Sequence, residues 1–102
     1  MRGHRVKPEW RTVQVFISNQ AAGIFEVEID TNSRDIRCSC PVWKKTMTCK
    51  HVKFVDLRMR DNDGHYSIQI PSDIPEDMAI DASDDATTFR EFVLKYAKIE
   101  VL

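Results

Sequence analysis

Three cysteines and one histidine lie within fourteen residues of this chain, and together they offer the ligands of a transition metal. Cys38 and Cys40 form a Cys-x-Cys pair, and Cys49 and His51 form a Cys-x-His pair after a gap of eight residues. Three thiolates and an imidazole suit zinc, whereas calcium and magnesium prefer oxygen ligands and iron–sulfur clusters usually take four thiolates. No cysteine of the chain is left over for a disulfide or a free nucleophile. The Cys3His cluster, as we call these four residues, therefore predicts one tetrahedral Zn²⁺ site.

The ligand count predicts a structural zinc, because four protein ligands leave no coordination position for an activated water. Catalysis has little other support in the sequence. No Gly-rich phosphate loop or nucleophile-elbow motif is present, and the acidic group Asp81, Asp84 and Asp85 is more typical of solvated or capping residues than of a cation site. We therefore expect a protein that is not an enzyme.

The spacing of the ligands predicts the elements that carry them. Alternate residues of a strand point to the same face, so Cys38 and Cys40 at the end of a strand can reach one ion, with Pro41 stopping the strand. Residues two apart on a helix point about 200° away from each other. Cys49 is therefore expected just before a helix and His51 in its first turn, where the helix dipole and Lys50 favour thiolates.

The run CSCPVWKKTMTCKHVKFV, which follows a pair of alternating strands, resembles a SWIM zinc finger. The signature of that family is CxC, a variable gap and CxH in a ββα arrangement, and the resemblance covers about residues 12 to 60. It implies zinc binding with nucleic-acid or protein recognition, since SWIM modules occur in chromatin-remodelling ATPases, transposases, recombination factors and ubiquitin-pathway proteins. The competing interpretation is a coincidental cluster of buried cysteines.

Charge is unevenly distributed along the 102 residues. Residues 1 to 60 carry twelve Lys and Arg against six Asp and Glu, whereas residues 61 to 102 carry three against ten. This separation indicates either two different partners or one half that shields the other. No apolar run is long enough for a membrane span, and the polar start lacks a secretory signal. Cysteines used as ligands fit a reducing compartment, so we expect an intracellular protein, cytoplasmic or nucleoid or nuclear, with no membrane partner.

The hydrophobic pattern predicts an α+β fold with a small antiparallel sheet of three to five strands. A basic arm over residues 1 to 11 precedes the SWIM-like module at 12 to 60, which consists of strands at 12–18, 24–30 and 35–40 and a helix at 50–60. The first two strands form a hairpin around a turn at 19–23. In the first strand the alternation puts Val13, Val15 and Ile17 on one face.

The acidic extension, residues 61 to 102, is expected to pack as part of the same domain. Its pattern predicts a strand at 66–70, an irregular segment at 71–85, an amphipathic helix at 88–97 and an edge strand within 98–102. Thr88 and Glu91 form a plausible capping box for the helix. The helix is expected to dock on the open face of the zinc-bound sheet, with dimer formation or binding of another protein as the alternative.

One aromatic and five cationic residues near the ligands are candidates for contact with nucleic acid. They are Trp43, Lys44 and Lys45 in the loop between the ligand pairs and Lys50, Lys53 and Arg60 on the helix. Trp43 has a rival role, since an aromatic residue in a short metal loop often packs over the site. Lys50, Lys53 and Arg60 also have a rival role, because they could simply form the solvent-exposed face of the helix. The basic arm, with Arg2, Arg5, Lys7 and Arg11, is either a phosphate contact or a solubilising terminus.

Two function classes follow. In the first, zinc fixes the scaffold and basic residues bind nucleic acid, DNA rather than RNA, without specific base readout. In the second, the chain is a protein-interaction adaptor that presents the helix at 88–97 or the acidic segment at 71–85 to a protein partner. The chain is expected to be a monomer or a homodimer.

Overall fold

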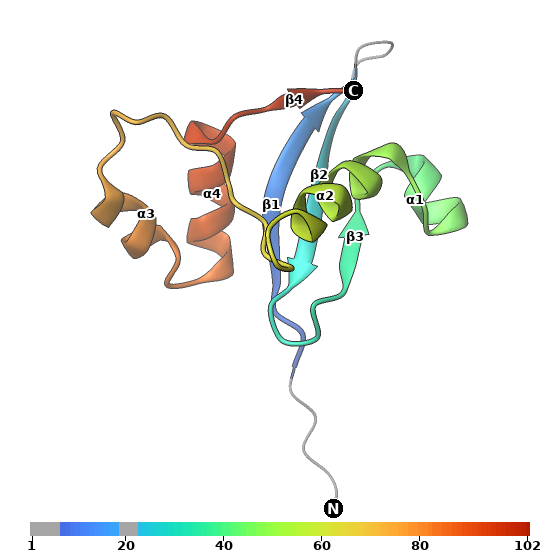
Figure 1. Ribbon diagram of the computed structural model, residues 1–102, viewed down its shortest axis with the longest axis horizontal. Helices are drawn as coiled ribbons and strands as arrows, with labels where there is room; N and C mark the ends of the chain where they lie inside the picture. Colours follow the sequence, from blue (N-terminus) through green and yellow to red (C-terminus); the bar gives the residue numbers. More distant parts are fainter. Residues whose placement is uncertain (1–6, 19–22) are drawn as a thin grey trace, which may run out of the picture.

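The computed structural model describes residues 7–18 and 23–102, which form an α+β fold around a four-stranded sheet (Figure 1). The strand order is β3-β2-β1-β4. The elements in chain order are β1 (Trp10–Ile17), β2 (Ile24–Asp30), β3 (Ile36–Cys38), α1 (Pro41–Thr46), α2 (Lys50–Arg60), α3 (Glu76–Ala82), α4 (Ala86–Tyr96) and β4 (Glu100–Val101). The predicted fold class is confirmed, but the sheet is mixed rather than antiparallel, because β4 pairs parallel to β1.

The β1–β2 hairpin contains a register shift that the strand pattern did not predict. Thr12 pairs with Glu28, but Gln14 already pairs with Val27, so the strand bulges between Thr12 and Gln14. As a result Val13 packs in the same cluster as Phe16. The prediction that Val13 shares a face of the strand with Val15 and Ile17 is therefore wrong, because Val13 lies on the side of Phe16.

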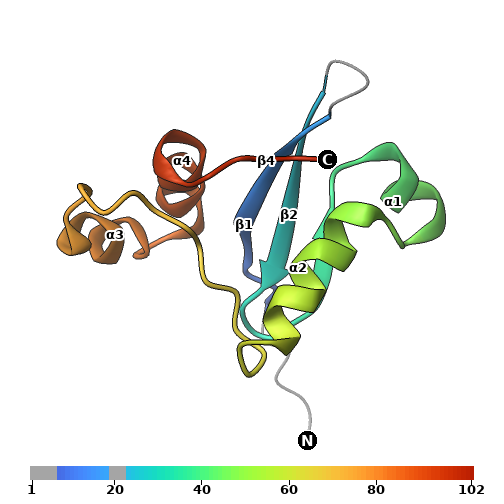
Figure 2. The same ribbon diagram turned by 45° about the horizontal axis from the view of Figure 1, so that its top comes forward.

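Helices α2 and α4 lie on opposite sides of the hairpin (Figures 1 and 2). On the α2 side the buried core includes Phe16, Val27 and Val55 together with the three cysteines. On the other side α4 packs against β1 and buries Phe92 and Val93. The expectation that the C-terminal amphipathic helix docks on the sheet is confirmed.

An ion pair fixes α4 to the sheet. The Arg90 guanidinium donates to both carboxylate oxygens of Glu26 on β2, at 2.8 and 2.7 Å, and Thr12 Oγ1 donates to the same carboxylate. The hydrogen bond from Arg90, opposed by burial, holds the pKa of Glu26 below its ordinary value. Glu26 therefore faces α4, while its neighbours Phe25 and Val27 belong to the α2 side.

The predicted strand at 66–70 is wrong, because this segment is extended but pairs with no strand of the described chain. Its side chains do alternate between half-buried and exposed, which explains the misleading pattern. Tyr66 instead donates its hydroxyl to Gln14 at 2.6 Å, and Gln14 donates to the Lys98 carbonyl at 2.8 Å. Burial, partly offset by Arg58, raises the pKa of the Tyr66 hydroxyl. The segment is thus anchored by side chains and by one backbone hydrogen bond, from the Lys98 N–H to the Gln69 carbonyl at 2.8 Å, rather than by a backbone ladder.

Two further predictions about the acidic extension are wrong in detail. The segment 71–85 contains the helix α3, whose first turn carries Glu76 and Asp77, charges that favour a helix N-terminus. The N-cap of α4 is Asp85, which accepts from the Thr88 backbone N–H at 2.8 Å, so Thr88 lies inside the helix rather than at its cap. The edge strand expected within 98–102 is present as β4.

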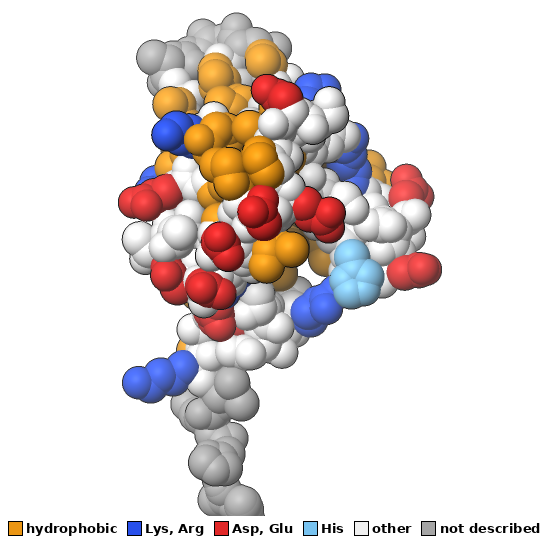
Figure 3. Space-filling model, turned by 90° about the vertical axis from the view of Figure 1, so that its left-hand side faces the viewer, with side chains coloured by type: hydrophobic (Ala, Val, Ile, Leu, Met, Phe, Trp, Pro, Cys, Tyr) orange, Lys and Arg blue, Asp and Glu red, His pale blue; other side chains and the backbone are white. Residues whose placement is uncertain are grey.

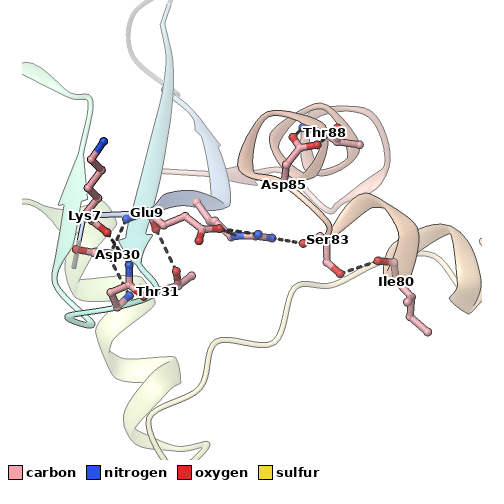
Figure 4. Close-up of polar contacts among 10 residues, drawn as sticks. Lys7, Glu9, Asp30, Thr31, Ile80, Ser83, Asp85 and Thr88 are labelled. Atoms are coloured by element: carbon pink, nitrogen blue, oxygen red, sulfur yellow. Dashed lines mark hydrogen bonds and ion pairs between the residues drawn. The ribbon is translucent and has the colours of Figure 1, made fainter.

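The start of β1 is anchored on both sides (Figure 4). Asp30 accepts from the Glu9 backbone N–H at 3.0 Å, and the Thr31 backbone N–H donates to the Glu9 carbonyl at 3.0 Å. Arg11 donates to the Ser83 carbonyl at 2.7 Å and pairs with Glu9. The predicted arm therefore ends before Trp10, and Arg11 is committed to contacts within the protein.

Two predicted features lie wholly or partly outside the described residues. Arg2 and Arg5 of the predicted arm belong to residues 1–6, and the hairpin turn at 19–23 falls mainly on residues 19–22. Among the described helices, none is both long enough and apolar enough to cross a membrane.

Candidate metal centre

The structure brings the four residues of the Cys3His cluster together. Cys38 ends β3, Cys40 is the N-cap of α1, Cys49 is the N-cap of α2, and His51 lies in the first turn of α2. Their ligand atoms all lie within 4.8 Å of one another. All four residues are buried, with exposed fractions of 3 to 6%. Three separate elements thus converge on one buried site, which can hold one metal ion.

Two helix N-termini meet at the cluster. The Trp43 backbone N–H donates to Cys40 Sγ at 3.5 Å, and the Val52 backbone N–H donates to Cys49 Sγ at 3.4 Å. The first-turn N–H groups of a helix have no partner within the helix, so each sulfur caps one helix while the positive end of the dipole favours its thiolate form. The placement of Cys49 before a helix and of His51 in its first turn is confirmed.

Helix α1 was missed by sequence reasoning, which took the gap between the ligand pairs for a loop with Pro41 as a stop. Pro41 does follow the end of β3, but it also occupies the first turn of α1. Proline is favoured there, because its fixed φ suits the helix and its missing N–H is not needed. A capping residue followed by proline, here Cys40 and Pro41, is the signal that could have predicted the helix. Met47, with φ of 56°, ends it.

His51 is enclosed by aromatic rings. Its ring centroid lies 4.8 Å from that of Phe16 and 5.5 Å from that of Phe25. Nδ1 lies 3.7 Å from Cys38 Sγ, whereas Nε2 is buried and has no hydrogen-bond partner among the described residues. A buried imidazole with one nitrogen directed at sulfur and none bound to a carbonyl or carboxylate fits a metal ligand better than a hydrogen-bonded core residue.

The dimensions of the cluster fit a tetrahedral zinc site. Zn–S bonds of about 2.3 Å and Zn–N bonds of about 2.0 Å place tetrahedral ligands about 3.5 to 3.8 Å apart. The Nδ1–Sγ distance of 3.7 Å already has this value, and the upper limit of 4.8 Å exceeds it by only about 1 Å. Sulfur and nitrogen donors without any oxygen donor select zinc over calcium or magnesium.

The acid–base properties of the ligands differ. Burial raises the pKa values of the Cys38 and Cys49 thiols, partly offset by hydrogen bonds from Cys40 and Val52 backbone N–H groups. Burial alone would also raise the pKa of Cys40, but hydrogen bonds from the Trp43 backbone and from the other two thiols outweigh it, so this pKa is lowered. Burial, aided by Lys50, lowers the pKa of His51 and keeps its imidazole neutral.

The residues predicted to contact nucleic acid fall into two groups. Lys44 and Lys45 on α1 and Lys50 and Lys53 on α2 are exposed. Trp43 is half-buried and packs against the core that contains the cysteines, in line with its rival role, and Arg60 pairs with Asp56 at 2.9 Å.

The four lysines lie on α1 and α2, the helices that Cys40 and Cys49 cap, and none of them belongs to the Cys3His cluster. Comparison of this chain with protein-family models, curated proteins and solved structures gives no match. The candidate metal site is therefore assigned from its ligand chemistry and geometry alone.

Proposed function

We propose that this protein is a SWIM-like module that holds one structural zinc and binds nucleic acid, DNA rather than RNA, without catalysing a reaction. The order of β1, β2 and α2 around a CxC and CxH ligand set supports the SWIM-like assignment. Helix α1 occupies the gap that is variable in that family. Zinc would join β3, α1 and α2, whose short lengths give them little stability of their own.

The observation that carries the nucleic-acid proposal is a set of four unpaired lysines beside the metal site. Lys44, Lys45, Lys50 and Lys53 are exposed, and within the described residues none of them forms an ion pair or a side-chain hydrogen bond. Four cations held on two short helices can contact phosphates, because their charges are not neutralised within the protein.

The remaining two candidates contribute less to such a surface. Arg60 lies on the same face of α2 as Lys53, but it is ten residues from Lys50, about 15 Å along the helix, and is paired with Asp56. Trp43 is half-buried against the cluster, so its ring serves the packing of the metal site rather than stacking on bases. Without an aromatic platform, binding should depend mainly on phosphate contacts and show little base specificity.

A salt-dependent titration with single- and double-stranded DNA and RNA tests this proposal. The double variant Lys44→Gln/Lys45→Gln should bind duplex DNA more weakly and reduce the slope of log K against log salt by about 1.8, the value for two lost phosphate contacts. The matched control is Lys95→Gln/Lys98→Gln, which removes the same charge from exposed positions at the end of α4 and just after it. Absence of binding at low salt, or equal weakening by both variants, would contradict the proposal.

A second candidate function, a protein-interaction adaptor, is favoured by one specific observation. Helix α4 packs against β1, yet its side toward α3, where Phe92 lies beside Met78 and Ala82, forms an apolar groove that is open to solvent. The two functions use different surfaces and do not exclude each other.

A further inference from the structure

The groove between α3 and α4 is apolar in its floor and acidic at its rim. It has a volume of about 330 Å³, and Met78, Phe92 and Tyr96 form its apolar lining together with Ala82. Asp81 and Glu91 stand at its edge. Figure 3 shows this side of the molecule, where apolar side chains gather and acidic side chains surround them.

The acidic charge around the groove is not neutralised within the protein. Residues 71 to 97 carry seven Asp and Glu against two cations, Arg90 and Lys95, a net charge of −5. Arg90 is committed to Glu26 on the sheet. Lys95 is at the groove itself, but neither Asp81 nor Glu91 forms an ion pair with any residue in the described parts of the chain. The groove therefore presents free carboxylates beside an apolar lining in which Met78 is 38% exposed and Phe92 and Ala82 form a buried floor.

We infer that this groove is a docking site for a cationic amphipathic helix of a partner protein. Apolar side chains of such a helix would enter the lining formed by Met78, Phe92 and Tyr96, and its Lys and Arg would face Asp81 and Glu91. A groove between two helices suits the helix-in-groove mode, in which apolar anchors give affinity and charge gives orientation. Nucleic acid is unsuited to this surface, because its phosphates would face carboxylates.

This inference rests on the second proposed function, the protein-interaction adaptor, and specifies that its partner presents a cationic amphipathic helix. It does not depend on the first, since the four lysines lie on α1 and α2, on the other side of the hairpin from α4. The nucleic-acid titration can therefore fail while groove binding holds, and the reverse is equally distinguishable.

The test uses the full chain with zinc and a synthetic fourteen-residue helical peptide, with Leu at positions i, i+3, i+4 and i+7 and mainly Lys elsewhere. Two matched peptides carry Glu in place of Lys or Ser in place of Leu. We expect the Lys–Leu peptide to bind with amide shift changes confined to α3 and α4. Both matched peptides should bind at least about tenfold more weakly, because each lacks one of the two interactions.

A charge-reversal pair locates the site. Asp81→Lys/Glu91→Lys should weaken binding of the Lys–Leu peptide about tenfold or more, while Asp35→Lys/Asp61→Lys, the same change at exposed positions away from the groove, should have less than about a twofold effect. An unchanged Tm, together with unchanged amide shifts of α3 and α4 away from the substituted positions, would show that both variants are folded. Met78→Ser, at a partly exposed position, tests the apolar lining without removing a core residue.

Four results would overturn the inference. Equal weakening by both charge-reversal variants would indicate general attraction to an acidic protein rather than a groove. If the peptide with Ser in place of Leu bound as tightly as the Lys–Leu peptide, or if neither bound, the groove would not be an apolar docking site. A concentration-dependent dimer that is lost in Asp81→Lys/Glu91→Lys would make the occupant a second copy of this chain instead of a partner helix.

Discussion

Two of the three sulfurs in the Cys3His cluster have a structural role besides that of a candidate metal ligand. Cys40 and Cys49 cap the helices that follow them, so the same sulfur accepts a backbone N–H and offers a lone pair to the metal. His51 fills the space between Phe16 and Phe25. Loss of one ligand therefore removes both a metal bond and a local structural contact.

Cys49→Ala is expected to lose the metal and to loosen the start of α2. Three remaining ligands bind zinc more weakly than four, and the Val52 N–H loses its acceptor. Elemental analysis after dialysis against a chelator should find close to no zinc, with a lower Tm than for the unaltered chain. The neighbouring change Lys50→Ala is the control and should keep its zinc. Equal zinc content and equal Tm for Cys49→Ala would show that Cys49 is not a ligand.

Zinc binding is expected to release protons. Because burial raises the pKa values of the Cys38 and Cys49 thiols, both carry protons near neutral pH before zinc displaces them, whereas the lowered pKa of His51 leaves its imidazole neutral. With two protons displaced, affinity should fall about 100-fold for each unit that the pH is lowered.

Calorimetry in buffers of different ionisation enthalpy counts these protons directly. A value of about two or more per zinc near neutral pH is expected from the two raised thiol pKa values. Binding without proton release, or affinity that does not change between mildly acidic and neutral pH, would mean that the thiols are not the ligands.

At the scale of elements, the buried Gln14 connects three parts of the chain. Its Oε1 accepts a hydrogen bond from the Tyr66 hydroxyl, and its Nε2 donates to the Lys98 carbonyl just before β4. The backbone of Gln14 itself belongs to β1. Gln14 is 4% exposed, so water cannot replace these partners easily. The hydrogen bonds of this side chain help to hold the 66–70 segment in place, which no strand pairing does.

Gln14→Leu should therefore destabilise the protein by about 1 to 3 kcal/mol, because it takes the partner from two partly buried polar groups, the Tyr66 hydroxyl and the Lys98 carbonyl. Chemical denaturation of the zinc-bound protein measures this loss. Tyr66→Phe is the matched comparison, since it removes one of the two bonds and should cost less than Gln14→Leu. A larger loss for Tyr66→Phe, or none for Gln14→Leu, would refute the role of this side chain.

The sequence predicted those elements whose residues are constrained by spacing or by a regular hydrophobic period. The ligand pairs placed Cys49 before a helix, and the periodic stripe placed α4. Local pattern failed where tertiary contacts decide. Alternate burial at 66–70 comes from anchoring by Gln14 rather than from pairing, and the bulge at Val13 shifts the faces of β1 without any break in the apolar pattern.

The hydrophobic pattern also could not predict the parallel direction of β4 or the short helices α1 and α3. The parallel pairing of β4 depends on the path through α3 and α4, which no residue of the short strand encodes. Helix α1 has six residues and α3 has seven, too few for a hydrophobic period to emerge. Pro41 and the acidic first turn of α3 were capping signals, and both were taken as signs of irregular structure.

At the scale of the whole molecule, charge is separated on the two sides of the sheet. The metal side carries the unpaired lysines of α1 and α2, and the side of α3 and α4 carries unpaired carboxylates. Both surfaces depend on the same sheet, because α2 and α4 pack on its opposite faces. A nucleic acid and a cationic protein helix could thus bind one molecule at the same time.

The central proposal is that the Cys3His cluster holds one zinc ion, which would join β3, α1 and α2. Zinc K-edge X-ray absorption of protein purified without added metal tests that claim most directly. We predict one zinc per chain with three sulfur neighbours at about 2.3 Å and one nitrogen at about 2.0 Å, the shell that the Cys3His cluster defines. A protein free of zinc, or a zinc shell made mainly of oxygen and nitrogen, would contradict the account.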